Sequence, residues 1–210
     1  MKDENFIKPT RKAFKLYENY SELYMKQIIF GIEGDLNYVK SLYGKSISTL
    51  RLLHYFESEK EVISCLPHSD MGFITLAICF SSGLEIKDLS TNKFFDAEKN
   101  APKKNCMMIF AGETLARLSG GYFKSPIHRV KSMKERYSIP FFFRGKNNSE
   151  LDVKKLNSDY LLKNIDLEDN YLMAPMKISK LYELTKIQYL ENEHPIELGK
   201  YKKDDYWKLE

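Results

Sequence analysis

The stretch that decides the fold, residues 121–143, reads GYFKSPIHRVKSMKERYSIPFFF. Two of its segments, His128–Val130 and Tyr137–Phe143, are rich in β-branched and aromatic residues and favour strands. In an extended strand, residues two apart project from the same face, so Arg136 and Ser138 should lie side by side. The stretch therefore predicts a β structure in which a guanidinium and a hydroxyl face the same space.

The rest of the middle of the chain is also composed of short β-prone segments. Turn-forming Gly, Ser and Asn residues separate further β-prone segments, which are Ser48–Phe56, Ile63–Leu66, Phe73–Cys79, Leu84–Lys87 and Met107–Phe110. Many short strands with little helix between them are typical of an antiparallel sandwich or barrel. The fold class predicted is mainly β with flanking helices.

Helices are expected on both sides of these strands. Apolar residues recur at three-and-four spacing from Thr10 to Phe30, and a second short helix is expected at Asp35–Tyr43. A third is expected near Ile178–Leu190. We expect one domain over residues 1–210, made of a helical lead-in (1–47), a β core (48–145) and a mixed tail (146–210).

Composition excludes several classes of protein. The 210 residues are 43% hydrophobic, and 33 basic and 29 acidic residues, interleaved along the chain, give a net charge of only +4. So mild and mixed a charge does not favour a nucleic-acid groove, and we read Lys103–Lys104 and Lys200–Lys203 as solvated surface. The polar N-terminus and the absence of a long apolar run predict no signal peptide and no membrane span.

Three cysteines, Cys65, Cys79 and Cys106, lack close pairing. An odd number without a CxxC motif indicates reduced thiols, so we expect a cytoplasmic protein. Each lies among apolar residues and is expected to be a buried structural thiol.

A metal site is suggested by His68-Ser69-Asp70, in which the imidazole and the carboxylate share one face of a strand. His128 is the best third ligand, because His54 fits a packed or hydrogen-bonded core position and His194 an exposed turn. Two histidines and one carboxylate on one side of an ion form the facial triad of non-haem Fe(II) oxygenases. The alternative is a surface histidine beside an aspartate in a turn, since H-x-D also arises by chance.

Arg136 and Ser138 make a receptor for a small carboxylate, because a guanidinium binds one bidentately and a hydroxyl adds a directed hydrogen bond. The alternative is an ion pair between Arg136 and Glu135 or another acid. Taken together, the two sites suit 2-oxoglutarate, which chelates iron through its keto-acid end and needs a fixed cation for its distal carboxylate.

At this point the sequence resembles the isopenicillin N synthase-like 2-oxoglutarate/Fe(II) dioxygenases. The resemblance runs collinearly over residues 49–143, through LRLLHY (50–55), HSDMGFITL (68–76), GLEI (83–86), FAGETL (110–115), GYFKSPIHRV (121–130) and RYSIPFFF (136–143). It implies a double-stranded β-helix, or jelly roll, with iron on His68, Asp70 and His128. It also implies 2-oxoglutarate on Tyr55, Arg136 and Ser138, with O2 as cosubstrate and ascorbate as an in vitro requirement.

The implied function is oxidation of a small organic substrate, by hydroxylation, desaturation or cyclisation, coupled to decarboxylation of 2-oxoglutarate to succinate and CO2. Two alternatives remain open: an Fe(II) oxidase of the isopenicillin N synthase type that needs no 2-oxoglutarate, and a catalytically silent, truncated homologue that binds ligand. The second is motivated by the family's usual N-terminal region, which is largely absent here. Three smaller departures from the family's pattern leave the candidate ligands in place. They are Phe56 where a proline is usual, Cys79-Phe80 where Gln-Asp is common, and Glu113 where an aspartate is usual. Met71, Phe73 and Phe142 are candidates for the pocket wall, and core packing explains them equally well.

Overall fold

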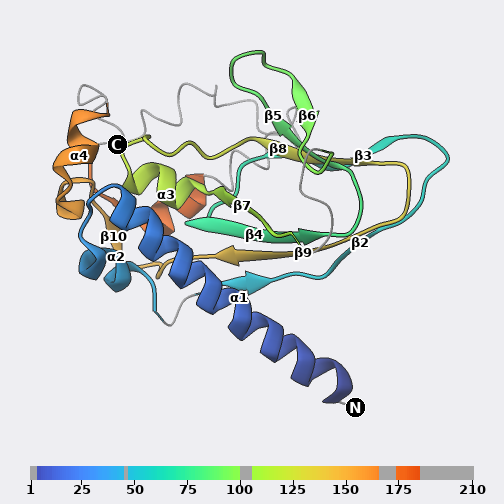
Figure 1. The fold of residues 1–210 in the computed structure, drawn as a ribbon, viewed down its shortest axis with the longest axis horizontal. Helices are drawn as coiled ribbons and strands as arrows, with labels where there is room; N and C mark the ends of the chain where they lie inside the picture. Colours follow the sequence, from blue (N-terminus) through green and yellow to red (C-terminus); the bar gives the residue numbers. More distant parts are fainter. Residues whose placement is uncertain (1–3, 45–46, 100–105, 166–173, 185–210) are drawn as a thin grey trace.

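Two antiparallel sheets form the centre of the computed structural model, which describes residues 4–44, 47–99, 106–165 and 174–184. The larger sheet has the order β1 (Thr49–Leu50), β9 (Arg136–Phe143), β4 (Ile74–Cys79), β7 (Met108–Ala111), with β2 (Leu53–Tyr55) also on β9. The smaller has the order β3 (Val62–His68), β8 (His128–Ser132), β5 (Leu84–Lys87), β6 (Phe94–Asp96). The two sheets lie as stacked layers (Figure 1).

The path of the chain between the layers defines the fold. β3 belongs to the smaller sheet, β4 to the larger, β5 and β6 to the smaller, β7 to the larger, β8 to the smaller and β9 to the larger. Strands that pass back and forth between two facing antiparallel sheets wind a jelly roll. The predicted double-stranded β-helix is confirmed.

Alternation along β4 and β9 separates a hydrophobic core from a cavity. Ile74 and Leu76 on β4, and Phe141 and Phe143 on β9, are almost fully buried in the core. The residues between them turn to the other face, between the sheets. One face of the larger sheet therefore builds the core, and the other is left for the site.

The segment predicted as one strand, Ser48–Phe56, is two short strands along β9. Register pairs Leu50 with Phe141 and Leu53 with Ser138, and the gap between them faces Pro140. Arg51 donates to the Pro140 carbonyl at 2.9 Å, but proline has no N–H to return a bond. The ladder is therefore interrupted at this point.

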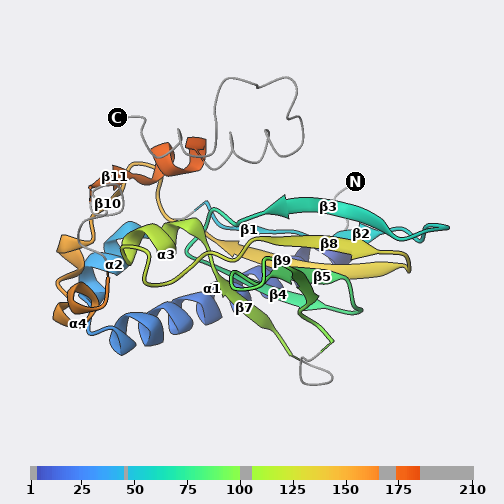
Figure 2. The same cartoon turned by 90° about the horizontal axis from the view of Figure 1, so that it is seen from above.

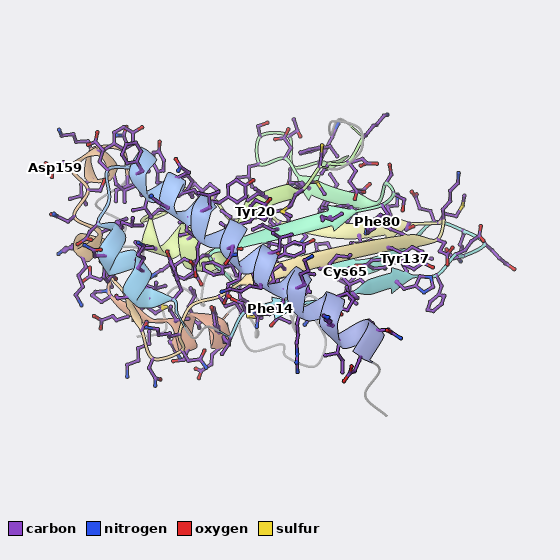
Figure 3. The ribbon with its side chains drawn as sticks, turned by 60° about the horizontal axis from the view of Figure 1, so that its bottom comes forward. Phe14, Tyr20, Cys65, Phe80, Tyr137 and Asp159 are labelled. Carbon is purple, nitrogen blue, oxygen red and sulfur yellow. The ribbon has the colours of Figure 1, made fainter. Side chains whose placement is uncertain are left out.

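Helix α1 (Glu4–Gly31) crosses the outer side of the larger sheet (Figures 1 and 3). Its buried residues, Tyr17, Ser21, Met25 and Ile29, recur every four positions and form one stripe. The Tyr17 ring stacks on Phe141 at 5.5 Å, and the Phe14 ring meets it edge-on at 5.2 Å. The helix begins six residues before the predicted start and includes Pro9 in its second turn, where proline lacks the N–H for one backbone hydrogen bond.

Helix α2 (Leu36–Leu42) is capped at its N-terminus by Asp35, whose carboxylate accepts from the amides of Asn37 and Tyr38. The short helices α2, α3 (Glu113–Leu118) and α4 (Asp159–Lys163) gather at one end of the sheets (Figure 2). The remaining short elements are η1 (Lys154–Leu156) and a small sheet of β10 (Glu150–Leu151) and β11 (Met176–Lys177). Of the helix expected at Ile178–Leu190, residues 178–184 are helical, and the others lie outside the described ranges. No helix within those ranges is long and apolar enough to cross a membrane.

Candidate metal centre and cosubstrate pocket

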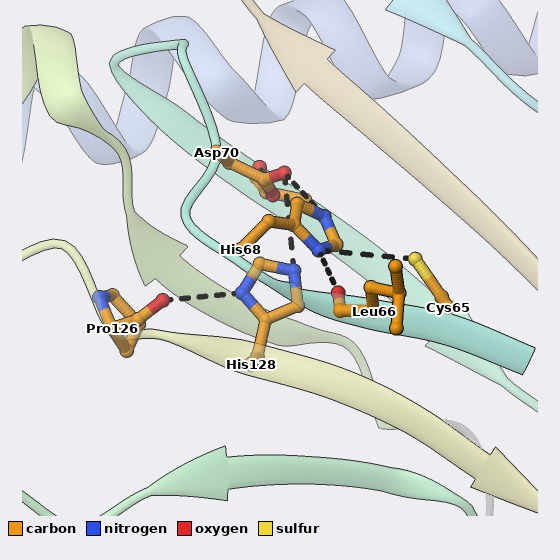
Figure 4. A network of polar contacts seen from close by, with 7 residues as sticks. Cys65, Leu66, His68, Asp70, Pro126 and His128 are labelled. Atoms are coloured by element: carbon orange, nitrogen blue, oxygen red, sulfur yellow. Dashed lines mark hydrogen bonds and ion pairs between the residues drawn. The ribbon is translucent and has the colours of Figure 1, made fainter. Parts of the chain in front are cut away.

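His68, Asp70 and His128 come together between the two sheets, with ligand atoms all within 4.8 Å of one another. Asp70 Oδ1 lies 3.7 Å from His68 Nε2 and 3.9 Å from His128 Nε2. His68 ends β3 and His128 begins β8, and the two residues are paired in register. Figure 4 shows both imidazoles directed toward the Asp70 carboxylate, which lies on the loop that follows β3.

Each imidazole is oriented by its other nitrogen. His68 Nδ1 lies 2.8 Å from the Leu66 carbonyl, and His128 Nδ1 lies 3.1 Å from the Pro126 carbonyl (Figure 4). A carbonyl only accepts, so both Nδ1 atoms carry a proton, and in the neutral form of each imidazole it is Nε2 that presents a lone pair to the cluster. Histidine ligands of metal ions are held in this way, so the donor set fits a divalent metal.

Asp70 is fixed by a hydroxyl and by the backbone. Its Oδ2 accepts a 2.5 Å hydrogen bond from the buried Thr75 hydroxyl, which leaves Oδ1 facing the histidines. Its carbonyl accepts from the Glu113 amide at 2.7 Å. This approach requires glycine, because a Cβ on Gly112 would lie 2.2 Å from the Gly72 carbonyl oxygen and 2.8 Å from that of Asp70.

Electrostatics differ between the two histidines. Burial lowers the pKa of His128, and the neighbouring His68 lowers it further against the attraction of Asp70. For His68, burial also acts to lower the pKa, but Cys65, Asp70 and the Leu66 carbonyl outweigh it and raise the pKa to about 9. Of the two histidines, His68 is therefore the one that holds its proton more strongly.

A cavity of about 90 Å³ connects this cluster to the predicted carboxylate receptor. Arg136, Ser138 and Tyr55 line it together with the three metal-type residues, so Arg136 and Ser138 share a face as predicted. Arg136 is 1% exposed and Ser138 is 5% exposed. The Arg136 guanidinium carbon lies 5.5 Å from the Tyr55 ring centre. Burial raises the pKa of the Tyr55 hydroxyl, and Arg136 and Ser138 oppose this.

Sequence reasoning did not anticipate the partner of Arg136 in this structure. Its Nη2 donates to Glu98 Oε1 at 2.6 Å, so the acid is Glu98 and not Glu135. Glu98 Oε2 also accepts from the Leu84 amide at 3.0 Å. Nothing in the sequence links positions 98 and 136, because Glu98 lies in a turn after β6 without strand periodicity.

The remaining residues singled out from the sequence lie in several different places in the structure. His54 is exposed, lies 2.8 Å from Glu135 and stacks on Tyr137. The hydrogen bond expected for His54 is confirmed, but the prediction that it lies in the core is wrong. Phe142 lines the cavity, whereas Phe73 packs in the core against Tyr43. His194, Lys103–Lys104 and Lys200–Lys203 lie outside the described residues.

The cysteines also differ from expectation. None of the three forms a disulfide, but Cys106 is exposed, and the half-buried Cys65 and Cys79 line the cavity. Buried structural thiols were the wrong expectation, because the strands that carry Cys65 and Cys79 turn these side chains toward the cavity. The Cys65 thiol lies 3.8 Å from His68 Nδ1.

A larger pocket of about 580 Å³ lies along β2 and β9. It is lined mainly by apolar side chains, with Phe80 and Tyr137 at the same end of the larger sheet (Figure 3). Among the described residues, the metal-type cluster of His68, Asp70 and His128 lines the smaller cavity and not this pocket.

A cluster of two histidines and one carboxylate inside a jelly roll defines a class of protein, the non-haem Fe(II) oxygenases. Residues 46–145 match the family model of the 2OG-Fe(II) oxygenase superfamily. Just under half of the chain is therefore similar to this superfamily, whose description names 2-oxoglutarate and Fe(II).

Two of the curated relatives are fungal proteins. A 2-oxoglutarate-dependent dioxygenase of Monascus ruber, citB, is 33% identical over 129 residues, which are 57% of this chain and 37% of the relative. A 2-oxoglutarate-Fe(II) type oxidoreductase of Emericella nidulans, hxnY, is 36% identical over 107 residues, 47% of this chain and 30% of the relative. The chain thus spans about a third of the length of these relatives.

Among solved structures, a full-length Neurospora crassa protein in complex with alpha-KG (2-oxoglutarate) and thymine superposes with a TM-score of 0.70. It is 25% identical, and the match covers 89% of this chain and 58% of the Neurospora chain. The likeness therefore extends beyond residues 46–145 and includes flanking helical parts.

Proposed function

We propose that this chain is a 2-oxoglutarate- and Fe(II)-dependent oxygenase that oxidises a small organic substrate. The observation that carries the proposal is one cavity with a metal-type triad at one end and a buried arginine with a serine at the other. Those are the two receptors that 2-oxoglutarate needs. The curated relatives of the same superfamily are named for the same cosubstrate.

His68, Asp70 and His128 would hold Fe(II). The two Nε2 atoms and Asp70 Oδ1 converge, and the Leu66 and Pro126 carbonyls hold the imidazoles in the tautomer that binds a metal. Thr75 keeps the second carboxylate oxygen away from the ion. Three ligands from one side leave other coordination positions open for the cosubstrate and O2.

Arg136, Ser138 and Tyr55 would bind the distal carboxylate of 2-oxoglutarate. Arg136 and Ser138 are almost fully buried, so water competes little for the guanidinium and the hydroxyl. Arg136 Nε and Nη1 are buried without a hydrogen-bond partner. Buried polar groups are rarely left unpaired, so these donors favour an anionic ligand here.

Bound Fe(II) and 2-oxoglutarate would supply the oxidising chemistry, with succinate and CO2 as the products of the cosubstrate. The protein's own part is to orient the cosubstrate between its two receptors and to exclude water from the arginine. The oxidation at the substrate would be a hydroxylation, a desaturation or a cyclisation. Phe142 and Arg51 both line the cavity, with the Arg51 guanidinium carbon 5.5 Å from the Phe142 ring centre, and are candidate substrate contacts.

Succinate release tests the proposal. The purified chain is incubated with Fe(II), 2-oxoglutarate, ascorbate and O2 across a panel of small organic compounds, and succinate is measured. Succinate above the level of an Asp70→Ala control supports the proposal. Oxygen consumption that is independent of 2-oxoglutarate, with no succinate, would instead identify an oxidase, and the absence of both would identify a silent homologue.

A further inference from the structure

A second carboxylate occupies the cosubstrate end of the cavity. The Glu98 carboxylate accepts from Arg136 Nη2 at 2.6 Å and from the Leu84 amide at 3.0 Å. Its side chain is 10% exposed, and that of Arg136 is 1% exposed. We propose that Glu98 is an internal carboxylate that shares the Arg136 guanidinium with the cosubstrate and sets the affinity for it. This inference rests on the proposed function.

The hydrogen-bond inventory of Arg136 supports sharing. A guanidinium has five N–H groups, and the three on Nε and Nη1 are buried without a partner. Glu98 is held by Oε1 and Oε2 to two different groups, so it does not take up these donors. The arginine is therefore anchored on one side and available on the other.

The negative charge of Glu98 affects both the stability of the protein and the binding of 2-oxoglutarate at Arg136. An arginine with no carboxylate beside it, buried to this degree, would be strongly destabilising, and Glu98 supplies the missing negative charge. The same charge repels an incoming carboxylate, because a ligand bound to the free donors of Arg136 lies close to Glu98 in a poorly screened site. Glu98 should thus stabilise the ligand-free protein and weaken the binding of 2-oxoglutarate.

A second feature shows that the geometry is built around this arginine. Gly83 has φ +139°, and a Cβ there would lie 3.2 Å from Arg136 Cδ and Nε and 2.9 Å from the Lys131 carbonyl oxygen. Leu84, the next residue, donates its amide to Glu98. One turn therefore accommodates the arginine and anchors its carboxylate partner.

The test compares Glu98→Gln with Glu85→Gln. Glu85 is a matched control, because it pairs with Arg129 at 2.6 Å in the neighbouring strands and does not line the cavity. Binding of 2-oxoglutarate and of pyruvate to the Mn(II)-loaded proteins is measured by calorimetry without O2. Pyruvate has the keto-acid group but no distal carboxylate.

We expect Glu98→Gln to bind 2-oxoglutarate about tenfold more tightly than the wild type, with pyruvate binding unchanged. Its ligand-free melting temperature should fall, and 2-oxoglutarate should raise it by more than in the wild type, since binding then pairs the unpaired charge of Arg136. Glu85→Gln should leave both affinities as they are. If Glu98→Gln fails to fold, Glu98→Asp, which withdraws the charge by one methylene, should tighten 2-oxoglutarate binding about threefold.

Unchanged or weaker 2-oxoglutarate binding in the folded Glu98 variant, with binding intact in the wild type, overturns the inference and leaves the proposed function standing. Equal tightening of pyruvate also overturns it, because the effect would not act through the distal carboxylate. A wild type and a Glu98 variant that both bind neither keto acid contradict the proposed function and the inference together.

Discussion

The carbonyl of Asp70 accepts a hydrogen bond from the amide of Glu113 at 2.7 Å. This contact joins the loop that carries the candidate metal ligand to the first turn of α3, far along the chain. The Thr114 hydroxyl adds a second bond, to the Met71 carbonyl at 2.6 Å. The position of Asp70 is therefore determined by α3 as much as by β3.

Gly112 is expected to tolerate no side chain, because its backbone lies against the carbonyls of Gly72 and Asp70. Gly112→Ala should destabilise the protein by about 2–3 kcal/mol and weaken Mn(II) binding, because the new methyl group would meet the Gly72 and Asp70 carbonyls. Chemical denaturation and metal titration measure both effects. Gly31→Ala is the control, since a Cβ there has no neighbour within 4 Å; equal effects of the two variants would contradict the explanation.

Thr75 is expected to tune the metal site through Asp70. Thr75→Val keeps the shape of a side chain that is 1% exposed and removes its hydrogen bond to Asp70 Oδ2. Loss of such a supporting bond should weaken Mn(II) binding at least about tenfold. Thr10→Val, which removes a hydroxyl on the exposed part of α1, should not change metal affinity. A Thr75→Val protein with wild-type affinity would show that Asp70 needs no such support.

Arg136 should decide cosubstrate binding without affecting the metal. Arg136→Ala is expected to raise the 2-oxoglutarate concentration needed for half-saturation about a hundredfold, because it removes the cation and leaves Glu98 unpaired. Mn(II) affinity, measured separately, should stay at the wild-type value. Arg129→Ala, which breaks the equivalent pair with Glu85, is the matched control. A half-saturation concentration that does not change in Arg136→Ala would refute the carboxylate receptor.

Two buried tyrosines predict how the protein responds to alkali. Burial raises the pKa of Tyr17 and of Tyr43 to about 12, against an ordinary value of 10. The folded state thus prefers the protonated phenols, so their contribution to stability is complete below pH 10 and is lost as the pH rises toward about 12.

We expect alkaline unfolding in this range, with the last part of the rise in tyrosinate absorbance, which comes from the buried tyrosines, coinciding with the loss of circular dichroism. Tyr17→Phe should move the alkaline midpoint upward. At neutral pH it should cost about 1 kcal/mol, because the hydroxyl donates to the Ile139 carbonyl at 3.1 Å. Tyrosine ionisation that is complete before any unfolding would contradict this account.

The alternation of apolar and polar residues predicted most of the strands, and the types and spacing of His and Asp residues predicted the metal-type cluster. Leu84–Lys87 has the predicted bounds, and β4 and β9 differ from prediction by one residue. This works because alternation in a half-buried strand is encoded within the strand itself. The H-x-D pair was recognisable from its residue types and spacing, although Asp70 lies on the loop after β3 and not on the strand as predicted.

Contacts between distant segments were not predictable in this way. Glu98 reaches Arg136 across 38 residues from a turn. Helix α3 is only six residues long, which is less than two helical turns and too short to show a recurring apolar pattern. Thr75 could have been found, because it is the polar residue on the same face of β4 as Ala77 and Cys79. The one-domain division of the chain stays a prediction.

Metal binding is the measurement that tests the central claim most directly. The chain, Asp70→Ala, His128→Ala and a His54→Ala control are titrated anaerobically with Fe(II) by calorimetry. We predict one Fe(II) per chain in the wild type and in His54→Ala, and no measurable binding in Asp70→Ala or His128→Ala. Fe(II) affinity that survives unchanged in both of those variants would contradict the assignment of His68, Asp70 and His128 as the metal centre.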